Sequence, residues 1–270
     1  MNLSTRFRDL HQSGLLVLPN AWDAGSARLM QEAGATAIAT SSAALAWSNG
    51  WPDGDALPLD VLLRAVGGIA RVISVPLTVD AEGGYSDDPA TVAESVLKIA
   101  DAGAVGINLE DGGASVDVTC AKIANIRKRL AAAGVDLFIN LRTDVYLRQL
   151  APEDERLAES LRRAKLYREA GADGLFVPLA SQAEDIKALA AQPMPLNVMA
   201  VPGLPALDEL KSLGARRLSA GTAVWAASMG QAMRLGKDFI AHGNADALFT
   251  PDNIKGGWMN GLFALNRPSA

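Results

Sequence analysis

The chain has 270 residues, of which 49 % are hydrophobic and 20 % are charged, and its formal net charge at pH 7 is −5. This composition allows a large apolar core and argues against disorder. It also argues against a nucleic-acid partner, because phosphate binding needs a basic surface. No apolar run approaches the roughly 18 residues of a membrane span, and the N-terminus lacks the apolar stretch of a signal peptide. The one cysteine, Cys120, fits a reducing compartment, so we expect a cytoplasmic protein.

Strands and helices are predicted to alternate along the chain. The strands are expected at 15–19, 36–40, 75–79, 105–109, 137–141, 174–178, 195–199 and 216–220. The helices are expected at 24–33, 58–71, 89–102, 120–133, 153–170, 182–191, 205–213 and 222–242. A helix end, a glycine and an apolar strand recur as EAGATAI, DAGAVGI and EAGADGL, which is typical of the turns between helix and strand in a parallel sheet.

This alternation predicts an α/β fold, a (β/α)8 or TIM barrel, over residues 1–243. An open doubly wound sheet is the alternative, but no predicted strand is followed by a G-x-G-x-x-G pattern. The C-terminal extension, residues 244–270, is rich in glycine, asparagine and proline but contains Trp258, Leu262 and Phe263. These apolar side chains have no place left on their own barrel, so we expect the extension to pack on a neighbouring subunit.

Polar residues gather where the predicted strands end. In chain order they are Asn20, Trp22, Asp23, Ser41, Ser42, Asp80, Glu82, Glu110, Asp111, Arg142, Asp144, Asn197 and Ser219. The starts of the strands carry valine, leucine, proline and glycine instead. The chemistry of a (β/α)8 barrel takes place at the C-terminal ends of its strands, so this difference predicts an active site.

Three of these acids, Asp80, Glu82 and Glu110, are expected to meet in one pocket. Like charges so close together would take up protons unless a cation lay between them. Oxygen ligands with few histidines favour Mg²⁺ or Mn²⁺ over zinc. The alternative is that Asp80 and Glu82 only begin a solvated loop. Asp87 and Asp88 are better explained as the N-cap of the next helix.

Arg142 and two serines are candidates for binding a substrate. The guanidinium of Arg142 suits a carboxylate or a phosphonate, although it could instead form a structural ion pair with Glu110 or Asp144. Ser41 and Ser42, with the backbone N–H groups that follow them, could hold substrate oxygens or could simply cap a helix.

Several stretches together resemble the isocitrate lyase/phosphoenolpyruvate mutase superfamily, most closely its short branch similar to carboxyvinyl-carboxyphosphonate phosphorylmutase and 2-methylisocitrate lyase. They are PNAWDAGSARLMQEAGATAIATSSAALA, VDAEGGYSDDP, GINLED, NLRTDVYL and NVMA, in this order over about residues 8–235. The resemblance implies a (β/α)8 barrel that is a homotetramer, a dimer of dimers in which paired subunits exchange the last helix. It also implies Mg²⁺ and a 2-oxo or enolpyruvate-type acid, with C–C or P–C bonds cleaved or formed.

The resemblance further implies roles for single residues. Asp80 would bind the metal directly, while Glu82 and Glu110 would hold its waters. The family more often has D-x-D here, so Glu82 reaches one methylene further. The implied substrate-binding residues are Ser41, Ser42, Ala43, Asp53, Arg142 and Asn197. From the residues alone, Asp53 either belongs to a mobile lid or forms a turn.

The departures from the family pattern bear on the chemistry. The lyases carry K-[KR]-C-G-H on a mobile loop after the fourth strand, where this chain has GGASVDVTCAKI (112–123). We therefore interpret Cys120 as a structural residue. Pro178 replaces the glutamate that the lyases have after strand six, and the longer gating loop of the mutases is also missing. True isocitrate lyase activity is therefore not expected.

We expect a magnesium-dependent lyase or mutase that breaks a C–C or P–C bond beside a pyruvate-like 2-oxo or 2-hydroxy acid through an enolate. Arg142, Glu110 and Tyr85 are the candidate catalytic residues. Tyr85, or a water held by Glu82, would act as a base for a hydroxy acid. The alternative is a catalytically reduced family member that binds a small oxo acid without turnover.

Overall fold

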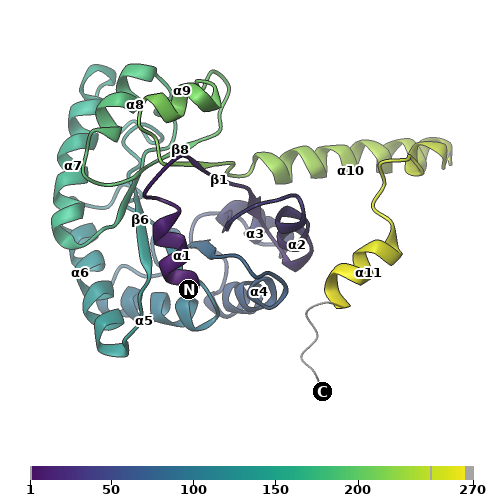
Figure 1. The fold of residues 1–270 in the computed structure, drawn as a ribbon, viewed down its shortest axis with the longest axis horizontal. Helices are drawn as coiled ribbons and strands as arrows, with labels where there is room; N and C mark the ends of the chain where they lie inside the picture. The colour runs from purple at the N-terminus through teal and green to yellow at the C-terminus, as the bar shows by residue number, and fades with distance from the viewer. Residues whose placement is uncertain (1, 244, 265–270) are drawn as a thin grey trace.

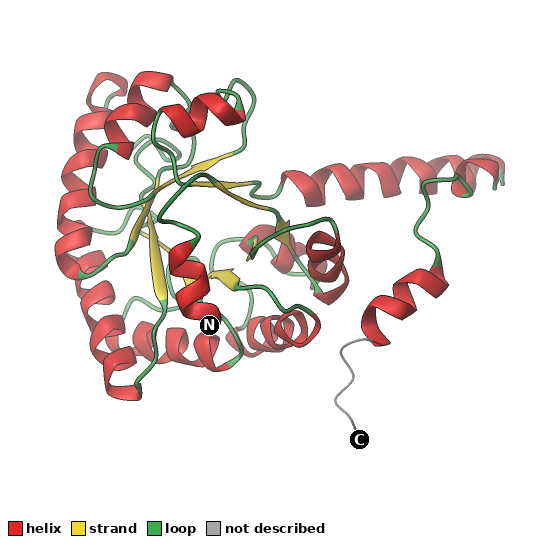
Figure 2. Ribbon diagram, viewed as in Figure 1, coloured by secondary structure: helices red, strands yellow, loops and turns green. Residues whose placement is uncertain are grey.

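Parallel strands form a barrel at the centre of the molecule, and helices surround it (Figures 1 and 2). The structure is a computed structural model that describes residues 2–243 and 245–264. Its strands are β1 (Leu16–Leu18), β2 (Asn20–Ala21), β3 (Ile38–Thr40), β4 (Leu77–Asp80), β5 (Gly106–Glu110), β6 (Phe138–Arg142), β7 (Gly174–Phe176), β8 (Leu196–Met199) and β9 (Arg217–Ser219). They pair in the order β1-β9-β8-β7-β6-β5-β4-β3-β2.

The first predicted strand, 15–19, is followed directly after Pro19 by a second short strand that was not predicted. β1 pairs with β9 and β2 pairs with β3, both in parallel, and only Pro19 separates β1 from β2. Proline has no N–H for a sheet ladder, so the strand breaks there and changes partner. Because both edges of the sheet meet at this segment, the barrel is nearly closed, and the predicted TIM barrel is confirmed.

Helices alternate with the strands along the chain. They are α1 (Leu3–Asp9), α2 (Ala24–Glu32), α3 (Ser42–Ser48), α4 (Leu59–Val72), α5 (Pro89–Asp101), α6 (Val116–Ala133), α7 (Arg156–Ala170), α8 (Ala183–Ala190), α9 (Leu207–Ser212), α10 (Ala223–His242) and α11 (Gly256–Ala264). Two short 3₁₀ helices cover Glu153–Glu155 and Asp246–Leu248. Each expected helix is present. The helix expected at 120–133 begins earlier, because the Ser115 hydroxyl accepts a hydrogen bond from Val118 N at 3.3 Å and caps it.

The helix α1, which the sequence did not predict, closes the N-terminal end of the barrel. Its Phe7 is fully buried and meets Phe138 of β6 edge to face, with ring centroids 5.6 Å apart. The His11 ring, just after this helix, stacks on Phe138 at 4.4 Å. Aromatic side chains therefore fill the N-terminal end of the barrel.

The last long helix, α10, leaves the barrel instead of covering it (Figure 1). No residue of α10 is buried. Val17 on the outer face of β1 is 47 % exposed, and an apolar groove of about 420 Å³ lies beside it, lined among others by Met30, Leu218 and Val224. One helix position around the barrel, over β1 and β9, is therefore uncovered within the chain.

The helix α11 contacts the helix α2 of the same chain. Leu262 is buried, and its carbonyl accepts a hydrogen bond from Arg28 Nε of α2 at 3.3 Å. The expected contact of residues 244–270 with a neighbouring subunit stays a prediction, and residues 244 and 265–270 lie outside the described part of the chain. Within the part that is described, no helix has both the length and the apolar character needed to cross a membrane.

Candidate active site

A cavity of about 180 Å³ opens at the C-terminal ends of the strands. Its lining consists of Asn20, Ser41, Ser42, Ala43, Asp53, Asp80, Asn108, Arg142, Leu147, Phe176, Pro178, Met199, Ser219, Gly221 and Thr222. The cavity thus contains six predicted site residues: Ser41, Ser42, Ala43, Asp53, Asp80 and Arg142. Four others, Glu82, Glu110, Tyr85 and Asn197, lie outside this lining.

Asp80, the last residue of β4, has an unusual carboxylate. Its backbone N–H donates to Thr40 Oγ1 at 2.8 Å, which ties it to β3. Its Oδ2 accepts a long hydrogen bond of 3.4 Å from Ser42 N, whereas its buried Oδ1 has no hydrogen-bond partner in the described part of the chain. Burial raises the pKa of Asp80, and the positive charge of Arg142 acts in the opposite direction. A buried carboxylate oxygen without a donor is suited to a cation.

The two serines have different tasks. Ser41 is buried and caps α3, because its hydroxyl accepts a hydrogen bond from Ala44 N at 3.4 Å. The helix-cap alternative therefore describes Ser41. Ser42 and Ala43 begin α3 and face the cavity. No helix is expected here from the sequence, since α3 has only seven residues and lies between a strand and a loop.

Glu82 is held by the loop that carries Asp53. Its Oε2 accepts a short hydrogen bond from Asp55 N, and its Oε1 accepts one from the Tyr85 hydroxyl at 3.2 Å. Asp55 Oδ1 in turn accepts a hydrogen bond from Tyr85 N at 3.3 Å. Burial, and then the nearby acids, raise the pKa of Glu82 to about 7. These contacts fasten the loop 49–58 over the end of β4 and hold Asp53 at the cavity.

Backbone conformation explains why these contacts were not visible in the sequence. Asp55, Glu82 and Tyr85 all have left-handed φ angles, of 57°, 48° and 61°. Such angles are uncommon for residues with a side chain and cluster at functional sites. The pKa of the Tyr85 hydroxyl is raised by burial and by Glu82, which disfavours its phenolate form.

Glu110 and Arg142, at the ends of neighbouring strands, form a buried ion pair. Arg142 Nη1 lies 2.7 Å from Glu110 Oε2, and Arg142 Nε and Nη2 donate to Asp144 at 2.6 and 3.0 Å. The structural pairing considered for Arg142 is therefore present. A guanidinium has five N–H groups, so Arg142, which also lines the cavity, keeps donors for a ligand. Burial outweighs the attraction of Arg142 and raises the pKa of Glu110 to about 8.

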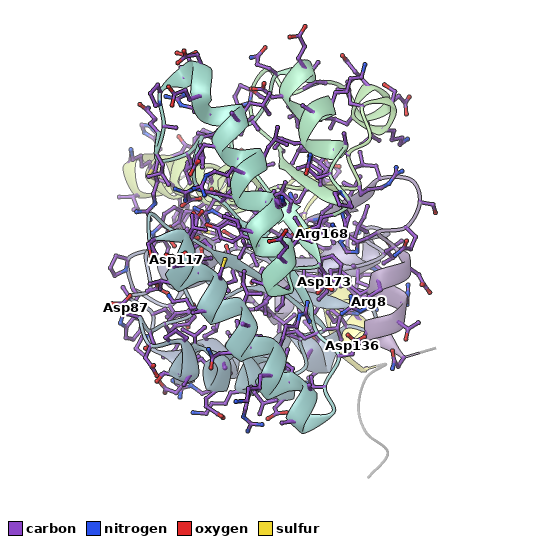
Figure 3. All side chains as sticks on the ribbon, turned by 90° about the vertical axis from the view of Figure 1, so that its left-hand side faces the viewer. Arg8, Asp87, Asp117, Asp136, Arg168 and Asp173 are labelled. Atoms are coloured by element: carbon purple, nitrogen blue, oxygen red, sulfur yellow. The ribbon has the colours of Figure 1, made fainter. Side chains whose placement is uncertain are left out.

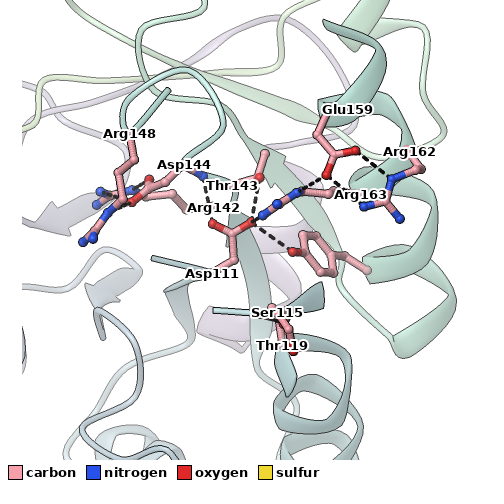
Figure 4. Close-up of polar contacts among 11 residues, drawn as sticks. Asp111, Ser115, Thr119, Arg142, Thr143, Asp144, Arg148, Glu159, Arg162 and Arg163 are labelled. Carbon is pink, nitrogen blue, oxygen red and sulfur yellow. Dashed lines mark hydrogen bonds and ion pairs between the residues drawn. The ribbon is translucent and has the colours of Figure 1, made fainter. Parts of the chain in front are cut away.

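Asp111 is a structural centre behind the site (Figure 4). It is fully enclosed and accepts hydrogen bonds from Thr143 Oγ1 at 2.7 Å and Asp144 N at 2.9 Å. Arg163 Nη1 and the Tyr167 hydroxyl of α7 donate to it at 2.8 and 2.9 Å. These bonds fix the ends of β5 and β6, and with them Glu110 and Arg142.

The predicted metal site can be tested against these contacts. Among residues 2–243 and 245–264, no three acidic, histidine or cysteine side chains form a ready-made metal cluster. Mg²⁺ usually keeps several waters and binds one or two carboxylates directly. The unpartnered Asp80 Oδ1, with two acids of raised pKa beyond it, fits an ion held in this way.

Four polar residues of the cavity were not chosen as site residues from the sequence: Asn20, Asn108, Ser219 and Thr222. Ser219 was noted only as a strand end, and Asn108 was not noted at all. A period of two was the available signal for Asn108, because Gly106, Asn108 and Glu110 share one face of β5. Asn20, in contrast, is fully used by the fold: it donates to Thr40 O at 2.7 Å and accepts from Ala220 N at 2.8 Å.

Several known proteins are similar to this chain in sequence. The model of the phosphoenolpyruvate phosphomutase family matches residues 7–240. An uncharacterised protein of Mycobacterium tuberculosis is 38 % identical over 230 residues, 83 % of this chain and 84 % of that one. The chloroplastic carboxyvinyl-carboxyphosphonate phosphorylmutase of Arabidopsis thaliana is 30 % identical over 233 residues, 78 % of this chain and 67 % of that one.

A solved structure and a further relative are also similar to this chain. A protein of Burkholderia cenocepacia J2315, provisionally named a phosphonomutase, is 42 % identical with a TM-score of 0.83 over 87 % of this chain and 99 % of that one. The 2-methylisocitrate lyase of Salmonella typhimurium is 35 % identical over 167 residues, 60 % of this chain and 57 % of that one. The named relatives thus include a lyase and a phosphorylmutase, and this chain belongs to the phosphoenolpyruvate phosphomutase family.

Proposed function

We propose that this chain is a lyase or mutase that depends on Mg²⁺ or Mn²⁺ and breaks a C–C or P–C bond beside a pyruvate-like 2-oxo or 2-hydroxy acid. The observation that carries the proposal is the unpartnered Asp80 Oδ1 in a small cavity that also holds Ser42 and Arg142. A cavity of about 180 Å³ suits an acid of a few carbon atoms.

The metal would be held by the acids at the ends of β4 and β5. Asp80 would bind it directly, and Glu82 and Glu110 would hold its waters. When bound, the ion would supply positive charge beside the oxygens of the pyruvate-like unit. It would also relieve the repulsion that raises the pKa values of Glu82 and Glu110.

The other residues would bind and orient the acid. Arg142 would use its remaining N–H groups for the departing or transferred acidic group. The hydroxyl of Ser42 would donate to the pyruvate-like unit. Breaking the bond leaves an enolate, and donors fixed in advance stabilise that developing charge more than the ground state.

The reaction that this site suits best is one without a strong protein base. The connection from β5 to α6 is short, since β5 ends at Glu110 and α6 begins at Val116. It leaves no room for the mobile loop of the lyases. Cys120 lies within α6, half buried, with its thiol 3.8 Å from Leu166 O. Decarboxylation of an oxaloacetate-like acid needs no base to begin and fits this site.

A binding protein without turnover is the second candidate. The short connection favours it, as does the pairing of three Arg142 N–H groups with Glu110 and Asp144. Such a protein would bind a small oxo acid in the same cavity and release it unchanged.

Turnover assays distinguish the candidates. Purified protein with Mg²⁺ would be given oxaloacetate, 2-methylisocitrate, 2,3-dimethylmalate and phosphonopyruvate, with pyruvate as the readout of cleavage and phosphoenolpyruvate as the readout of rearrangement. We expect one of these products from at least one acid, lost with a chelator and in Asp80→Ala. Asp87→Ala, which removes an exposed acid of the same loop, is the matched control. Binding of these acids without any product would support the binding protein.

The family resemblance also implies a homo-oligomer, and an apolar groove beside an exposed helix supports a proposal of helix exchange. We propose that α10 of a second copy fills the groove over β1 and β9. Met233 and Ile240 of α10 are 61 % and 86 % exposed within the chain, which is unfavourable unless a partner covers them. Val17→Asp places a charge beside this groove and should lower the molecular mass of the oligomer measured by light scattering. An unchanged mass would contradict the exchange.

A further inference from the structure

A chain of polar side chains crosses the interior of the barrel below the cavity. Barrels of this kind are normally filled by branched apolar side chains. Here the interior holds five hydrogen-bonded polar residues that are at most 6 % exposed: Asn108, Asn140, Asn197, Arg217 and Ser219. The last two belong to β9, and the asparagines belong to β5, β6 and β8.

Arg217 is the charged member of this chain. It is 1 % exposed, and its Nη2 donates to Asn108 Oδ1 at 3.1 Å. Its Nε and Nη1 have no hydrogen-bond partner among the described residues. Burying a guanidinium without an acid beside it opposes folding. Such a residue needs a task that an apolar side chain could not perform.

The direction of the hydrogen bonds is fixed at both ends of the chain. Arginine can only donate, so the atom of Asn108 that faces Arg217 must be its carbonyl oxygen. At the other end, Asn197 Nδ2 donates to the backbone carbonyl of Val198 at 2.7 Å, which can only accept. Asn140 Nδ2 lies between them and donates to Asn108 Oδ1 at 2.9 Å and to Asn197 Oδ1 at 3.3 Å.

Two donors are therefore left for the cavity. Both hydrogen bonds that reach Asn108 from the described residues use its oxygen, so none of those residues accepts from its amide N–H groups. Asn108 also lines the cavity. Ser219 Oγ accepts a hydrogen bond from Asn197 Nδ2 at 3.0 Å, so its own O–H is free to donate. Ser219 lines the cavity as well.

We propose that Arg217 is a positioning residue that fixes the Asn108 amide with its N–H groups toward the cavity, and that Asn108 and Ser219 donate hydrogen bonds to a carboxylate or enolate oxygen of the substrate. This inference rests on the proposed function, since it assigns residues to the same acid. Without Arg217, Asn140 Nδ2 is the one donor among the described residues that still holds the Asn108 oxygen. The amide then turns over more readily and presents its oxygen, which repels an anionic ligand.

Oxalate is the probe for the test, because its paired oxygens match the enolate end of a pyruvate-like acid. Its affinity with Mg²⁺ would be measured by calorimetry, independently of turnover. We expect Asn108→Leu and Arg217→Met each to weaken oxalate binding roughly tenfold or more, the effect of losing a hydrogen bond to a charged group. Arg217→Lys keeps a donor-only side chain and should retain affinity within about threefold.

The double variant separates positioning from a merely structural role. If Arg217 acts through Asn108, then Asn108→Leu with Arg217→Met binds oxalate no more weakly than Asn108→Leu alone. Arg216→Met is the matched control, because Arg216 precedes Arg217 and donates instead to Gly14 O at 3.4 Å. Should Arg217→Met fail to fold, Asn108→Leu and Ser219→Ala still test the two donors.

The outcomes distinguish this inference from the proposed function. Additive losses, or wild-type oxalate affinity in Arg217→Met, overturn the inference even if the enzyme turns over one of the four acids. No oxalate binding by the wild-type protein overturns it too. If the losses of oxalate affinity are coupled but none of the four acids is turned over, the inference is supported. Only the proposed reaction is then wrong.

Discussion

The two ends of the barrel handle their charges in opposite ways. At the C-terminal end, Asp80, Glu82 and Glu110 lie at or just after the ends of β4 and β5, and burial raises the pKa of each acid. Of the three, Glu110 forms an ion pair with Arg142. At the N-terminal end, charges of opposite sign are matched. Arg8 pairs with Asp136 at 2.6 Å and with Asp173 at 2.9 Å (Figure 3).

The acids at the N-terminal end have partners that need nothing from outside. Asp173 also pairs with Arg127 and accepts a hydrogen bond from Ile139 N at 2.7 Å. The hydrogen bond from Arg8 lowers the pKa of Asp136. The N-terminal end therefore stabilises the fold, whereas the C-terminal end buries acids that are less completely paired, as the proposed metal site requires.

An isosteric Asp→Asn substitution should affect turnover and stability in opposite ways at the two ends of the barrel. The largest effect is expected at the C-terminal end. Asp80→Asn should lower turnover by roughly a thousandfold or more, since it removes the charged ligand proposed for the metal. Without metal, its free energy of unfolding should not decrease, because a buried negative charge is lost. Urea unfolding beside the turnover assay checks both, and a clear loss of stability would contradict the incomplete pairing proposed for these acids.

Asp173→Asn, at the N-terminal end, should leave turnover within about twofold and lower the free energy of unfolding by about 2 kcal/mol. It leaves Arg8 and Arg127 without their shared carboxylate. Asp136→Asn is the matched control with a smaller expected loss, because the Asp136 side chain is 54 % exposed. If Asp173→Asn reduced turnover as strongly as Asp80→Asn, the division of labour between the ends would be wrong.

The fold was predictable because local signals repeat. Each glycine that ends a helix before a strand, such as Gly103 with φ of 116°, marks one step of the barrel. The split of the first strand at Pro19 and the helices α1 and α3 were missed. All three depend on partners distant in sequence, since α1 packs on Phe138 and Pro19 separates strands that pair with β9 and β3.

The site was predictable only as far as strand ends define it. That rule identified Asp80 and Arg142, which the structure places at the cavity. It could not show that Glu82 turns toward the Asp55 amide, because left-handed φ angles in two loops produce that contact. Nor could it place Asn197 below the cavity, since hydrogen bonds across three strands decide its position.

A pH dependence of stability is also expected, and it too arises at the N-terminal end of the barrel. Burial lowers the pKa of His11 to about 3, whereas an unfolded histidine titrates near 6.5. Between these values the unfolded chain binds the extra proton, so stability falls as the pH falls, with a contribution of up to about 1.4 kcal/mol per pH unit. Below about pH 3 this contribution ends.

The measurement is the slope of the free energy of unfolding between pH 4 and 6, compared with His11→Leu. The variant should lose its part of the slope, although it also loses the ring that stacks on Phe138. His242→Gln is the matched control for removing a histidine, because His242 is exposed at the end of α10. Equal slopes in wild type and His11→Leu would show that His11 is not buried neutral.

The smallest effect is expected on the side of the barrel, between α5 and α6. Arg129 Nε lies 2.5 Å from Glu94 Oε1, closer than Arg8 lies to Asp173. Even so, Glu94→Ala should leave the free energy of unfolding unchanged within error, because water solvates both exposed groups equally well in the unfolded chain. A double-mutant cycle with Arg129→Ala measures the pair directly. A coupling as large as the loss in Asp173→Asn would mean that distance, rather than burial, decides which ion pairs stabilise this barrel.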